Sequence, residues 1–319
     1  MPPAGTSRGR AAVTGASGFI GSHVVTALDA AGWRLRLLAR REPPTIRASQ
    51  VPELVIGDLA DDEALETLVQ DCDLVVHAAG LVKARSRTEF FRVNAEATAR
   101  LVAIAARRPS PPRFLLVSSI AACEPNLSSY CASRRAAEDA LNREARDMRW
   151  GILRPVAVYG PHDREFLPFF RCVARGLAPR PAGIEPRLSM IFVRDLADLI
   201  VVVAEDQDSH GICWEADDGT PRGHSWVDLA AAAASALGTR PLSVAVGRWL
   251  LGLIAGGNDL ATACDGRARM FTREKLRELW HPDWGAAHRP ASGTKWQPRW
   301  DLTHGFAETA AWYRLNGWL

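Results

Sequence analysis

The chain has 319 residues, of which 47% are hydrophobic and 24% are charged, and its formal net charge is only +3 at neutral pH. This length and composition are typical of a globular protein that buries one large core or two linked ones. The small net charge and the lack of long blocks of like charge argue against a nucleic-acid partner. The longest apolar stretches, residues 196–204 and 249–256, are shorter than the roughly 20 residues that a membrane span requires.

The N-terminal segment and the cysteines bear on the compartment. The first ten residues contain arginines but no apolar segment before the first expected strand, so we expect a cytoplasmic protein without a secretory signal. No Cys-x-x-Cys pair is present, which argues against a zinc site or a disulfide framework and predicts reduced, structural cysteines and no metal. The six cysteines are Cys72, Cys123, Cys131, Cys172, Cys213 and Cys264.

Three glycines spaced three residues apart lie between a short apolar run and an apolar helical pattern. Gly15 permits a tight turn from strand to helix, Gly18 lets the backbone approach a pyrophosphate, and Gly21 lets the helix pack closely on the strand. The helix expected at residues 19–31 offers its N-terminal amides and its dipole to the anion. A glycine turn without a ligand is the alternative, and the flanking strand and helix disfavour it. The expected cofactor contacts here are Gly15, Ser17, Gly18, Phe19, Ile20 and Gly21.

The first half of the chain alternates short apolar strands with helical patterns. Near-continuous apolar strands separated by helices are typical of a parallel sheet that is covered on both faces. The sequence therefore predicts an α/β fold with a Rossmann-type doubly wound parallel sheet. The expected strands are residues 11–14, 35–39, 54–56, 74–77 and 114–118, and the helices after the first are residues 62–69, 89–106 and 133–146.

The second half has a different character. After about residue 150 the alternation loosens, proline and glycine become frequent, and nine of the eleven tryptophans appear. We expect residues 1–160 to form the dinucleotide-binding domain, with the segment near 186–204 returning to it. Residues 161–319 are expected to form a smaller α/β substrate-binding region.

The residues after the second expected strand distinguish NAD from NADP. In an NAD site an Asp or Glu binds the ribose hydroxyls, whereas an arginine accommodates the 2′-phosphate of NADP. This chain places Arg40 and Arg41 there, with no acid until Glu42. A guanidinium binds a phosphate through charge-assisted hydrogen bonds, so the sequence favours NADP(H) over NAD(H). The alternative is that one or both arginines are solvated loop residues.

Two later segments are also expected to contact the cofactor. Asp58 and Leu59 follow the third expected strand and are placed to flank the adenine, with the carboxylate accepting from its amino group. Ala78, Ala79 and Gly80 close the fourth expected strand with small side chains, where a cofactor needs room.

Hydroxyl groups and a tyrosine–arginine pair carry the expected chemistry. Ser118 and Ser119 end the fifth expected strand, and Tyr130 follows eleven residues after Ser119, with Arg134 four residues further on. Residues four apart share one face of a helix, so the guanidinium is expected beside the phenol. A nearby positive charge favours the ionised form of a phenol, which suits proton transfer to or from an alcohol. A Tyr and an Arg at this spacing, taken alone, are usually structural.

These motifs together resemble the extended branch of the short-chain dehydrogenase/reductase superfamily. That branch includes nucleotide-sugar epimerases, dihydroflavonol reductases and 3β-hydroxysteroid dehydrogenases. The resemblance covers nearly the whole chain and rests, in order, on TGASGFIGSHV, GDLAD, HAAG, VNAEATARL, VSSIAA, YCASRRAAE, LRPVAVYGP, FVRDLAD and KWQPRWDLTHGFAETAAWYR.

The resemblance assigns roles to particular residues. It implies that Tyr130 is the catalytic tyrosine and that Ser119 holds the carbonyl oxygen, with Ser118 as the neighbouring alternative. It also implies a catalytic role for Asn94. Cofactor contacts are implied for Pro155 and Val158, which lie in the segment leading into the substrate region.

Position 134 departs from the family pattern, which is Tyr-x-x-x-Lys. In the family the lysine bonds the nicotinamide ribose and supports the tyrosine. Arg134 keeps the charge but is bulkier, planar and effectively never deprotonated. Arg135 points about 100° further round the helix and cannot simply substitute. The residue is either a tolerated replacement in a working enzyme or the mark of a non-catalytic nucleotide-binding protein.

Two substrate classes remain open. The arginines at positions 171, 175, 180 and 187 are candidates to bind the diphosphate of a nucleotide sugar, although arginines are also ordinary surface residues. The aromatic segment 166–170 and the apolar run 249–255 suit a long apolar substrate that enters from a membrane surface. A buried structural helix explains the second run equally well.

Three longer phrases resemble a proteobacterial subgroup that includes ceramide-synthesis reductases; they are VKARSRTEFFRVNAEATARL, FLLVSSIAACEPNLSSY and MFTREKLRELWHPDW. That resemblance implies NADPH-dependent reduction of the 3-oxo group of a ceramide or sphingoid base, with Tyr130 as general acid. The alternatives are a nucleotide-sugar epimerase or dehydratase with tightly bound NAD, and a non-catalytic NADP-binding regulatory protein. We also expect peripheral contact with the inner face of the membrane and, by analogy with the family, a homodimer.

Overall fold

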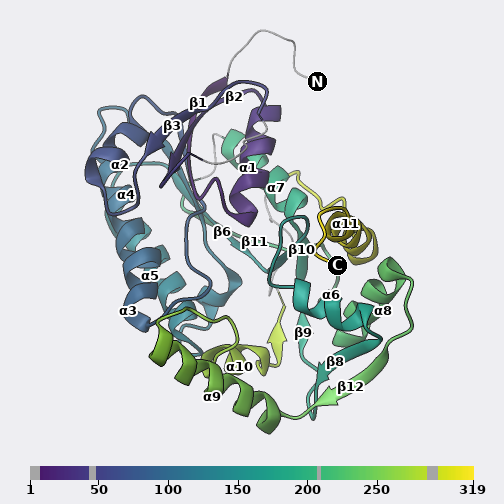
Figure 1. Cartoon of the computed structure of the whole chain (residues 1–319). Coiled ribbons are helices and arrows are strands. Elements are labelled where there is room, and N and C mark those ends of the chain that lie inside the picture. Colours follow the sequence, from purple (N-terminus) through teal and green to yellow (C-terminus); the bar gives the residue numbers. More distant parts are fainter. Residues whose placement is uncertain (1–7, 43–47, 207–209, 286–293) are drawn as a thin grey trace.

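The computed structural model describes residues 8–42, 48–206, 210–285 and 294–319 (Figure 1). Its first half alternates strands and helices as the sequence predicts. The elements are β1 (Arg8–Thr14), α1 (Phe19–Ala30), β2 (Trp33–Ala39), β3 (Glu53–Ile56), α2 (Asp62–Val69), β4 (Leu74–His77), α3 (Arg87–Phe90), η1 (Phe91–Glu96), α4 (Ala97–Ala106), β5 (Arg113–Val117), η2 (Ile120–Cys123), α5 (Ser129–Glu144) and β6 (Trp150–Pro155).

Among the described residues, seven parallel strands form the central sheet in the order β11-β6-β5-β4-β1-β2-β3, where β11 is Ile212–Ala216. The chain builds outward from β1 through β2 and β3 and then returns to the other side of β1 with β4. The predicted doubly wound Rossmann-type sheet is therefore confirmed. The strand order reverses between β1 and β4, where Thr14 pairs with His77, and ligands of such sheets bind at the carboxyl ends beside this point.

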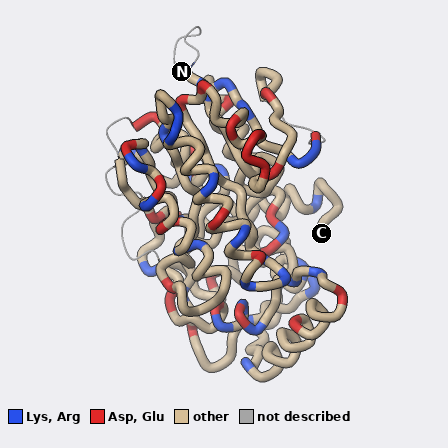
Figure 2. The backbone as a smooth tube through the Cα atoms, turned by 90° about the vertical axis from the view of Figure 1, so that its left-hand side faces the viewer, with Lys and Arg blue, Asp and Glu red and all other residues tan. Residues whose placement is uncertain are grey.

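Charges of both signs are distributed over the molecule. Figure 2 shows Lys and Arg interspersed with Asp and Glu along the chain. In the part of the chain that the structure describes, no helix is long and apolar enough to cross a membrane. All six cysteines are free, and the described residues contain no group of side chains that would hold a metal ion.

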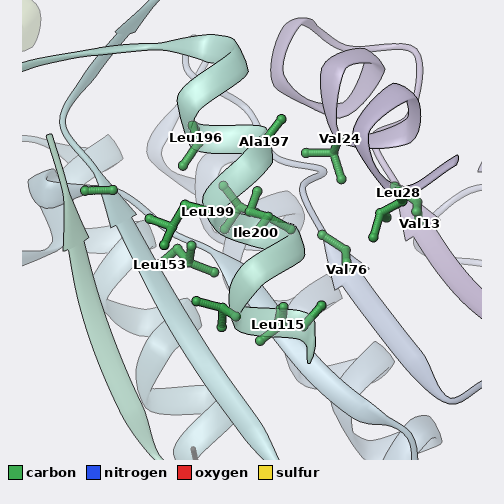
Figure 3. Close-up of a cluster of buried hydrophobic side chains, with 14 of the residues drawn as sticks. Val13, Val24, Leu28, Val76, Leu115, Leu153, Leu196, Ala197, Leu199 and Ile200 are labelled. Carbon is green, nitrogen blue, oxygen red and sulfur yellow. The ribbon is translucent and has the colours of Figure 1, made fainter. Parts of the chain in front are cut away.

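Apolar clusters cover both faces of the sheet because the strands are apolar on both sides. On one face lie α1 and α7 (Val193–Glu205), although α7 comes from the second half of the chain. On the other face lie α2, α4 and α5. Figure 3 shows the first of these clusters, in which α7 packs over the strands through Leu196, Leu199, Ile200, Val76, Leu115 and Leu153.

In the described chain the second half adds small pairs of parallel strands: β10 with β7, β12 with β8, and β13 with β9. A third apolar cluster, rich in aromatic rings, joins its helices α6, α8 and α11. Where the substrate region begins stays a prediction. The elements are β7 (Ala157–Tyr159), α6 (Leu167–Ala174), β8 (Leu177–Pro181), β9 (Arg187–Leu188), β10 (Met190–Phe192), α8 (Trp226–Leu237), β12 (Leu242–Val246), α9 (Arg248–Asp265), α10 (Arg273–Leu279), β13 (Asp283–Trp284) and α11 (Leu302–Leu315).

The helix expected at 19–31 ends one residue early, at Ala30, and two others differ more from the predicted bounds. The helix expected at 133–146 begins at Ser129 and ends at Glu144, because the hydroxyl of Ser128 caps it by accepting from the Cys131 amide at 3.1 Å. The helix expected at 89–106 is interrupted by a π-helical segment, Phe91–Glu96, that apolar periodicity does not reveal. The aromatic segment 166–170 contributes mainly to the third apolar cluster, in which Phe169 and Phe170 are buried.

Candidate active site

The turn between β1 and α1 requires glycine for backbone reasons. Gly15 has a φ of +73°, and a Cβ there would lie 2.7–2.8 Å from backbone atoms of Ala78 and Ala79. A Cβ on Gly21 would collide with the Gly15 carbonyl oxygen. Helix α1 can therefore pack this closely on the turn after β1 only because residue 21 is glycine. The turn therefore brings the start of α1 against the carboxyl ends of β1 and β4.

The start of α1 is open to an anion. Gly18 is its N-cap, with φ −81° and ψ 172°, and no side chain caps the helix. Ser17 and Gly18 are exposed, so the first amides of α1 are available to a ligand. Arg40 and Arg41 are exposed directly after β2, and in the described part of the chain neither forms an ion pair. This edge fits a dinucleotide pyrophosphate and an additional phosphate.

The other expected cofactor residues follow β3 and β6. Asp58 is exposed and accepts from the Ala60 amide at 2.7 Å, while Leu59 packs against the apolar cluster under α2. Pro155 ends β6, and Val158 lies in β7 opposite Ile191 of β10. These positions lie at or beyond the carboxyl ends of central strands, the edge at which doubly wound sheets bind dinucleotides.

A buried chain of hydrogen bonds, which sequence reasoning missed, joins β1, β4 and α4. His77 lies 2.6 Å from the Thr14 hydroxyl through Nδ1 and 3.0 Å from the Thr98 hydroxyl through Nε2. Thr98 donates its own proton to the Asn94 carbonyl at 2.6 Å, so we assign the histidine proton to Nε2. Burial lowers the pKa of His77 to about 3, and Arg134 acts in the same direction. A neutral His77 therefore ties together the strand ends behind the site.

The structure brings Tyr130 and Arg134 together on one face of α5, as their spacing predicts. Tyr130 is half-buried, and its ring centroid is 5.9 Å from that of Phe90. The guanidinium carbon of Arg134 lies 5.4 Å from the centroid of the Tyr130 ring. Gly80 makes room for this guanidinium, because a Cβ there would lie 2.7 and 2.8 Å from its terminal nitrogens. Arg134 thus connects Tyr130 to the segment that follows β4.

Arg134 is buried without a full set of partners. It is 7% exposed, and its Nη1 lies 3.5 Å from the Val117 carbonyl oxygen. Its Nε has no hydrogen-bond partner, and among the described residues no carboxylate pairs with it. A buried cation without an anion is costly, so this position suits a compensating ligand oxygen or the phenolate of Tyr130.

The two serines after β5 differ in their surroundings. Ser118 is 4% exposed and donates to Glu138 at 2.6 Å, and Glu138 also binds Arg154 at 2.6 Å. Sequence reasoning missed this buried network, which uses the Ser118 hydroxyl proton. Ser119 is half-buried, caps η2 by accepting from the Ala121 amide at 3.2 Å, and retains its own proton for another partner. The geometry favours Ser119 as the serine that binds a substrate oxygen.

Asn94 lies in the π-helical segment and is 1% exposed. Its Oδ1 accepts from the Leu81 amide at 2.7 Å, and its Nδ2 donates to the Leu81 carbonyl at 3.0 Å and to Ser133 at 2.9 Å. Ser133 in turn donates to the Tyr130 carbonyl at 2.8 Å. Through these bonds Asn94 positions the segment after β4 against α5, and its predicted part in catalysis stays a prediction.

Helix α10, far away in sequence, holds the start of α5, and sequence reasoning missed it. Glu278 accepts from the Ser128 hydroxyl at 2.6 Å. Glu274 accepts from the Ser129 amide at 2.9 Å and its hydroxyl at 3.0 Å. Ser128 and Ser129 directly precede Tyr130 in the chain, so α10 fixes the helical turn that carries the phenol.

The arginines considered for a nucleotide-sugar diphosphate lie in the second half of the chain. Three of the four hydrogen-bond to the protein itself: Arg171 to the Trp318 carbonyl at 3.0 Å, Arg180 to Ser243 at 3.2 Å, and Arg187 to the carbonyls of residues 222 and 223 at 2.8 and 2.6 Å. These bonds give them a structural role.

Comparison with known proteins places the chain in a family. The NAD dependent epimerase/dehydratase family model matches residues 11–213. A ceramide reductase of Caulobacter vibrioides (strain NA1000 / CB15N) is 39% identical over 318 residues, which cover 98% of this chain and 97% of that protein. The 4-hydroxy-2-methyl-3-oxo-4-farnesyl-3,4-dihydroquinoline-1-oxide ketoreductase of Stigmatella aurantiaca is 30% identical over 178 residues, which cover 50% and 53%.

Solved structures share the fold. MoeE5 in complex with UDP-glucuronic acid and NAD has a TM-score of 0.70 and 23% sequence identity, covering 97% of this chain and 100% of that one. At this identity the likeness concerns the fold alone. The chain thus belongs to the NAD dependent epimerase/dehydratase family, and it is an NAD(P)-dependent oxidoreductase of the extended short-chain dehydrogenase/reductase type.

Proposed function

We propose that this enzyme reduces a ketone on a long-chain lipid, of the 3-oxo-ceramide or 3-oxo-sphinganine type, with hydride from NADPH. The observation that carries the proposal is the 39% identity to a ceramide reductase over nearly the whole of both chains. The arrangement of Tyr130, Arg134 and Ser119 supports a ketone-to-alcohol step, because it offers a proton donor, a cation and a hydroxyl near the ends of β4 and β5.

The residues at the sheet edge fit NADPH. The glycine turn and the start of α1 would hold the pyrophosphate, Arg40 and Arg41 the 2′-phosphate, and Asp58 with Leu59 the adenine. The nicotinamide end would lie near Ala78–Gly80, Pro155 and Val158. When bound, the cofactor supplies the hydride.

The protein groups supply the proton and hold the ketone. Ser119 donates a hydrogen bond to the ketone oxygen, and Tyr130 gives that oxygen its phenolic proton as the carbon accepts hydride, which yields the alcohol. Arg134 stabilises the phenolate that remains. Because a guanidinium does not release a proton, Arg134 cannot relay one as a lysine ammonium does, and Tyr130 recovers its proton from solvent.

A nucleotide-sugar epimerase or dehydratase with tightly bound NAD is the second candidate, and the family match favours it. Such an enzyme would retain NAD through purification and convert a sugar nucleotide without added cofactor. The structural bonds of Arg171, Arg180 and Arg187 weigh against it, because they involve three of the four arginines considered for a diphosphate.

The deciding assay measures NADPH oxidation by the purified protein with 3-oxo-sphinganine or 3-oxo-ceramide in detergent, with NADH and a panel of nucleotide sugars alongside. We expect lipid-dependent loss of NADPH that Tyr130→Phe lowers strongly while cofactor binding stays nearly unchanged. Turnover of a nucleotide sugar and none of the lipids would establish the second candidate. NADPH binding with no turnover of any ketone would indicate a regulatory protein.

We further propose that the enzyme acts in the cytoplasm and meets its lipid at the inner face of the membrane. A homodimer is expected by analogy with the family. Size-exclusion chromatography with light scattering measures that state directly.

A further inference from the structure

Helix α9 packs only lightly on the rest of the protein. Of its 18 residues, only Ala255 is buried. Figure 1 shows it along the lower edge of the molecule, beside α10. The apolar run 249–255 is therefore not a buried structural helix. Five of the six large apolar side chains of α9 have high exposed fractions, and only Leu251 is half-buried; the five are Trp249 73%, Leu250 42%, Leu253 67%, Ile254 50% and Leu260 68%.

The five exposed side chains form one face. At about 100° per residue, they fall within an arc of about 140° around the helix axis, and the remaining positions of that arc are Gly257, Ala261 and Cys264. No charged residue of α9 lies in this arc. Ala255 lies about 170° from its centre, so the middle of the apolar face points away from the protein. Trp249 and Leu253, toward one edge of the arc, line the groove against α10. A wide, charge-free, exposed face marks a surface that is covered by a partner or a membrane.

Positive charge borders this face on the side of α10, and near the opposite edge Asp265 is paired with Arg269 at 2.7 Å. Between α9 and α10 runs an open groove of ≈850 Å³, lined by Trp249, Leu253 and Leu276 and by Arg248, Arg273 and Arg277. Arg277 also lies 3.4 Å from Glu274. The carboxylates of Glu274 and Glu278 face α5, where they bind Ser129 and Ser128. Helix α10 thus presents Arg273 and Arg277 to the groove, while Glu274 and Glu278 bind the start of α5, and the groove complements an anionic surface.

The strand that leads into α9 is also apolar and exposed. Leu242 and Val244 alternate along β12 with exposed fractions of 72% and 39%. Leu177 of β8, 47% exposed, pairs with Leu242. Because cross-strand partners and alternate residues share one face of a ribbon, these three side chains lie together.

We propose that α9 lies in the interface of an anionic lipid bilayer, with its apolar face among the acyl chains and Arg248, Arg273 and Arg277 at the level of the phosphates. The purpose of this docking rests on the proposed lipid substrate, whereas the binding itself does not. Since α10 contacts both the groove and the start of α5, it connects the docked helix to the helix that carries Tyr130. A lipid ketone would then reach the site without leaving the membrane surface.

The test is co-sedimentation of the full-length protein with phosphatidylcholine vesicles that contain or lack phosphatidylglycerol. Leu253→Glu should weaken partitioning into the mixed vesicles about tenfold or more, because it removes a leucine that the membrane would bury and adds a charge of the same sign as the lipid phosphates. Val227→Glu is the matched control, since Val227 lies on α8 with a similar exposed fraction of 64%. Arg273→Gln should weaken binding about fivefold, and only where phosphatidylglycerol is present.

Several results would overturn this proposal. They are an absence of binding to the mixed vesicles, equal binding by wild type and Leu253→Glu, or equal losses in Leu253→Glu and Val227→Glu. A dimer without vesicles that Leu253→Glu converts to monomer would identify α9 as an interface between copies of the chain instead. Vesicle binding without ketone reduction would refute only the proposed function. Reduction of a short-chain, water-soluble ketone without vesicle binding would refute only the docking surface.

Discussion

The contact between Gly80 and Arg134 gives a sharp test of the proposed site. Gly80 has no positive φ, so its backbone accepts alanine. The added methyl carbon of Gly80→Ala would lie 2.7 and 2.8 Å from the terminal nitrogens of Arg134, whereas unstrained contacts of this kind need about 3.5 Å. The guanidinium must therefore move by roughly 0.7 Å, and it has little free space because Arg134 is 7% exposed.

The expected cost follows from this displacement. Misplacing a group by about 1 Å costs up to about 100-fold in rate, so kcat/KM for NADPH-dependent ketone reduction should fall about 10- to 100-fold. That loss corresponds to about 1.4–2.7 kcal/mol of transition-state stabilisation. Gly257→Ala is the control, because a Cβ there meets nothing within 4 Å. The assay is initial-rate NADPH oxidation, with thermal unfolding measured alongside to separate activity from stability.

A double-mutant cycle identifies the contact responsible. Arg134→Lys removes the planar fork that the new methyl group meets, so Gly80→Ala should cost less in that background. We expect a coupling of about 1 kcal/mol or more between the two changes. Additive effects, or a wild-type rate for Gly80→Ala, would refute the conclusion that Gly80 keeps Arg134 in place.

Further predictions concern the cofactor, the serines and pH. Replacing Arg40 and Arg41 by Ala should weaken NADPH binding roughly tenfold or more and leave NADH binding nearly unchanged, as measured by calorimetry. Equal losses of affinity for the two cofactors would reject these arginines as phosphate ligands. Ser119→Ala should lower kcat and preserve the melting temperature. Ser118→Ala should mainly lower the melting temperature, because the buried carboxylate of Glu138 loses a hydrogen-bond donor. The reverse pattern would exchange the roles of the two serines. His77, with its pKa lowered to about 3, is neutral in the fold but titrates near 6.5 when unfolded. The protein should therefore lose stability as pH falls from about 6.5 toward 3, by up to about 1.4 kcal/mol per pH unit from this group. His77→Gln should flatten the denaturant-unfolding profile in that window, and parallel profiles would contradict the assignment.

The central sheet and the glycine turn were predictable because their signals are local. Each strand is a short apolar run bounded by helical patterns, and the order of these elements along the chain specifies a doubly wound sheet. Gly15 is required by the turn after β1, and Gly21 by the close packing of α1 on that turn. The pair Tyr130 and Arg134 was predictable for the same reason, since four residues on a helix fix a shared face.

Contacts between distant segments were not predictable in this way. The bond from Ser118 to Glu138 and the bonds from α10 to the start of α5 join residues that are 20, 145 and 150 positions apart. No periodicity encodes such pairings, because each depends on how whole helices pack. The same limit applies to α9, whose apolar run fits burial and exposure equally well until its neighbours are known.

The burial of Arg134 changes how the replacement of the family's lysine at this position is interpreted. From the sequence it was either a tolerated replacement or the mark of an inactive protein. In the structure it is a buried cation with an unpartnered Nε beside Tyr130, and no described carboxylate compensates its charge. Burying such a charge opposes folding. A negative charge on the Tyr130 oxygen, or an oxygen of a bound cofactor, would reduce that cost. On the proposed mechanism, we therefore expect Arg134 to favour the state of the site in which Tyr130 has given its proton to the ketone, more than it stabilises the resting protein.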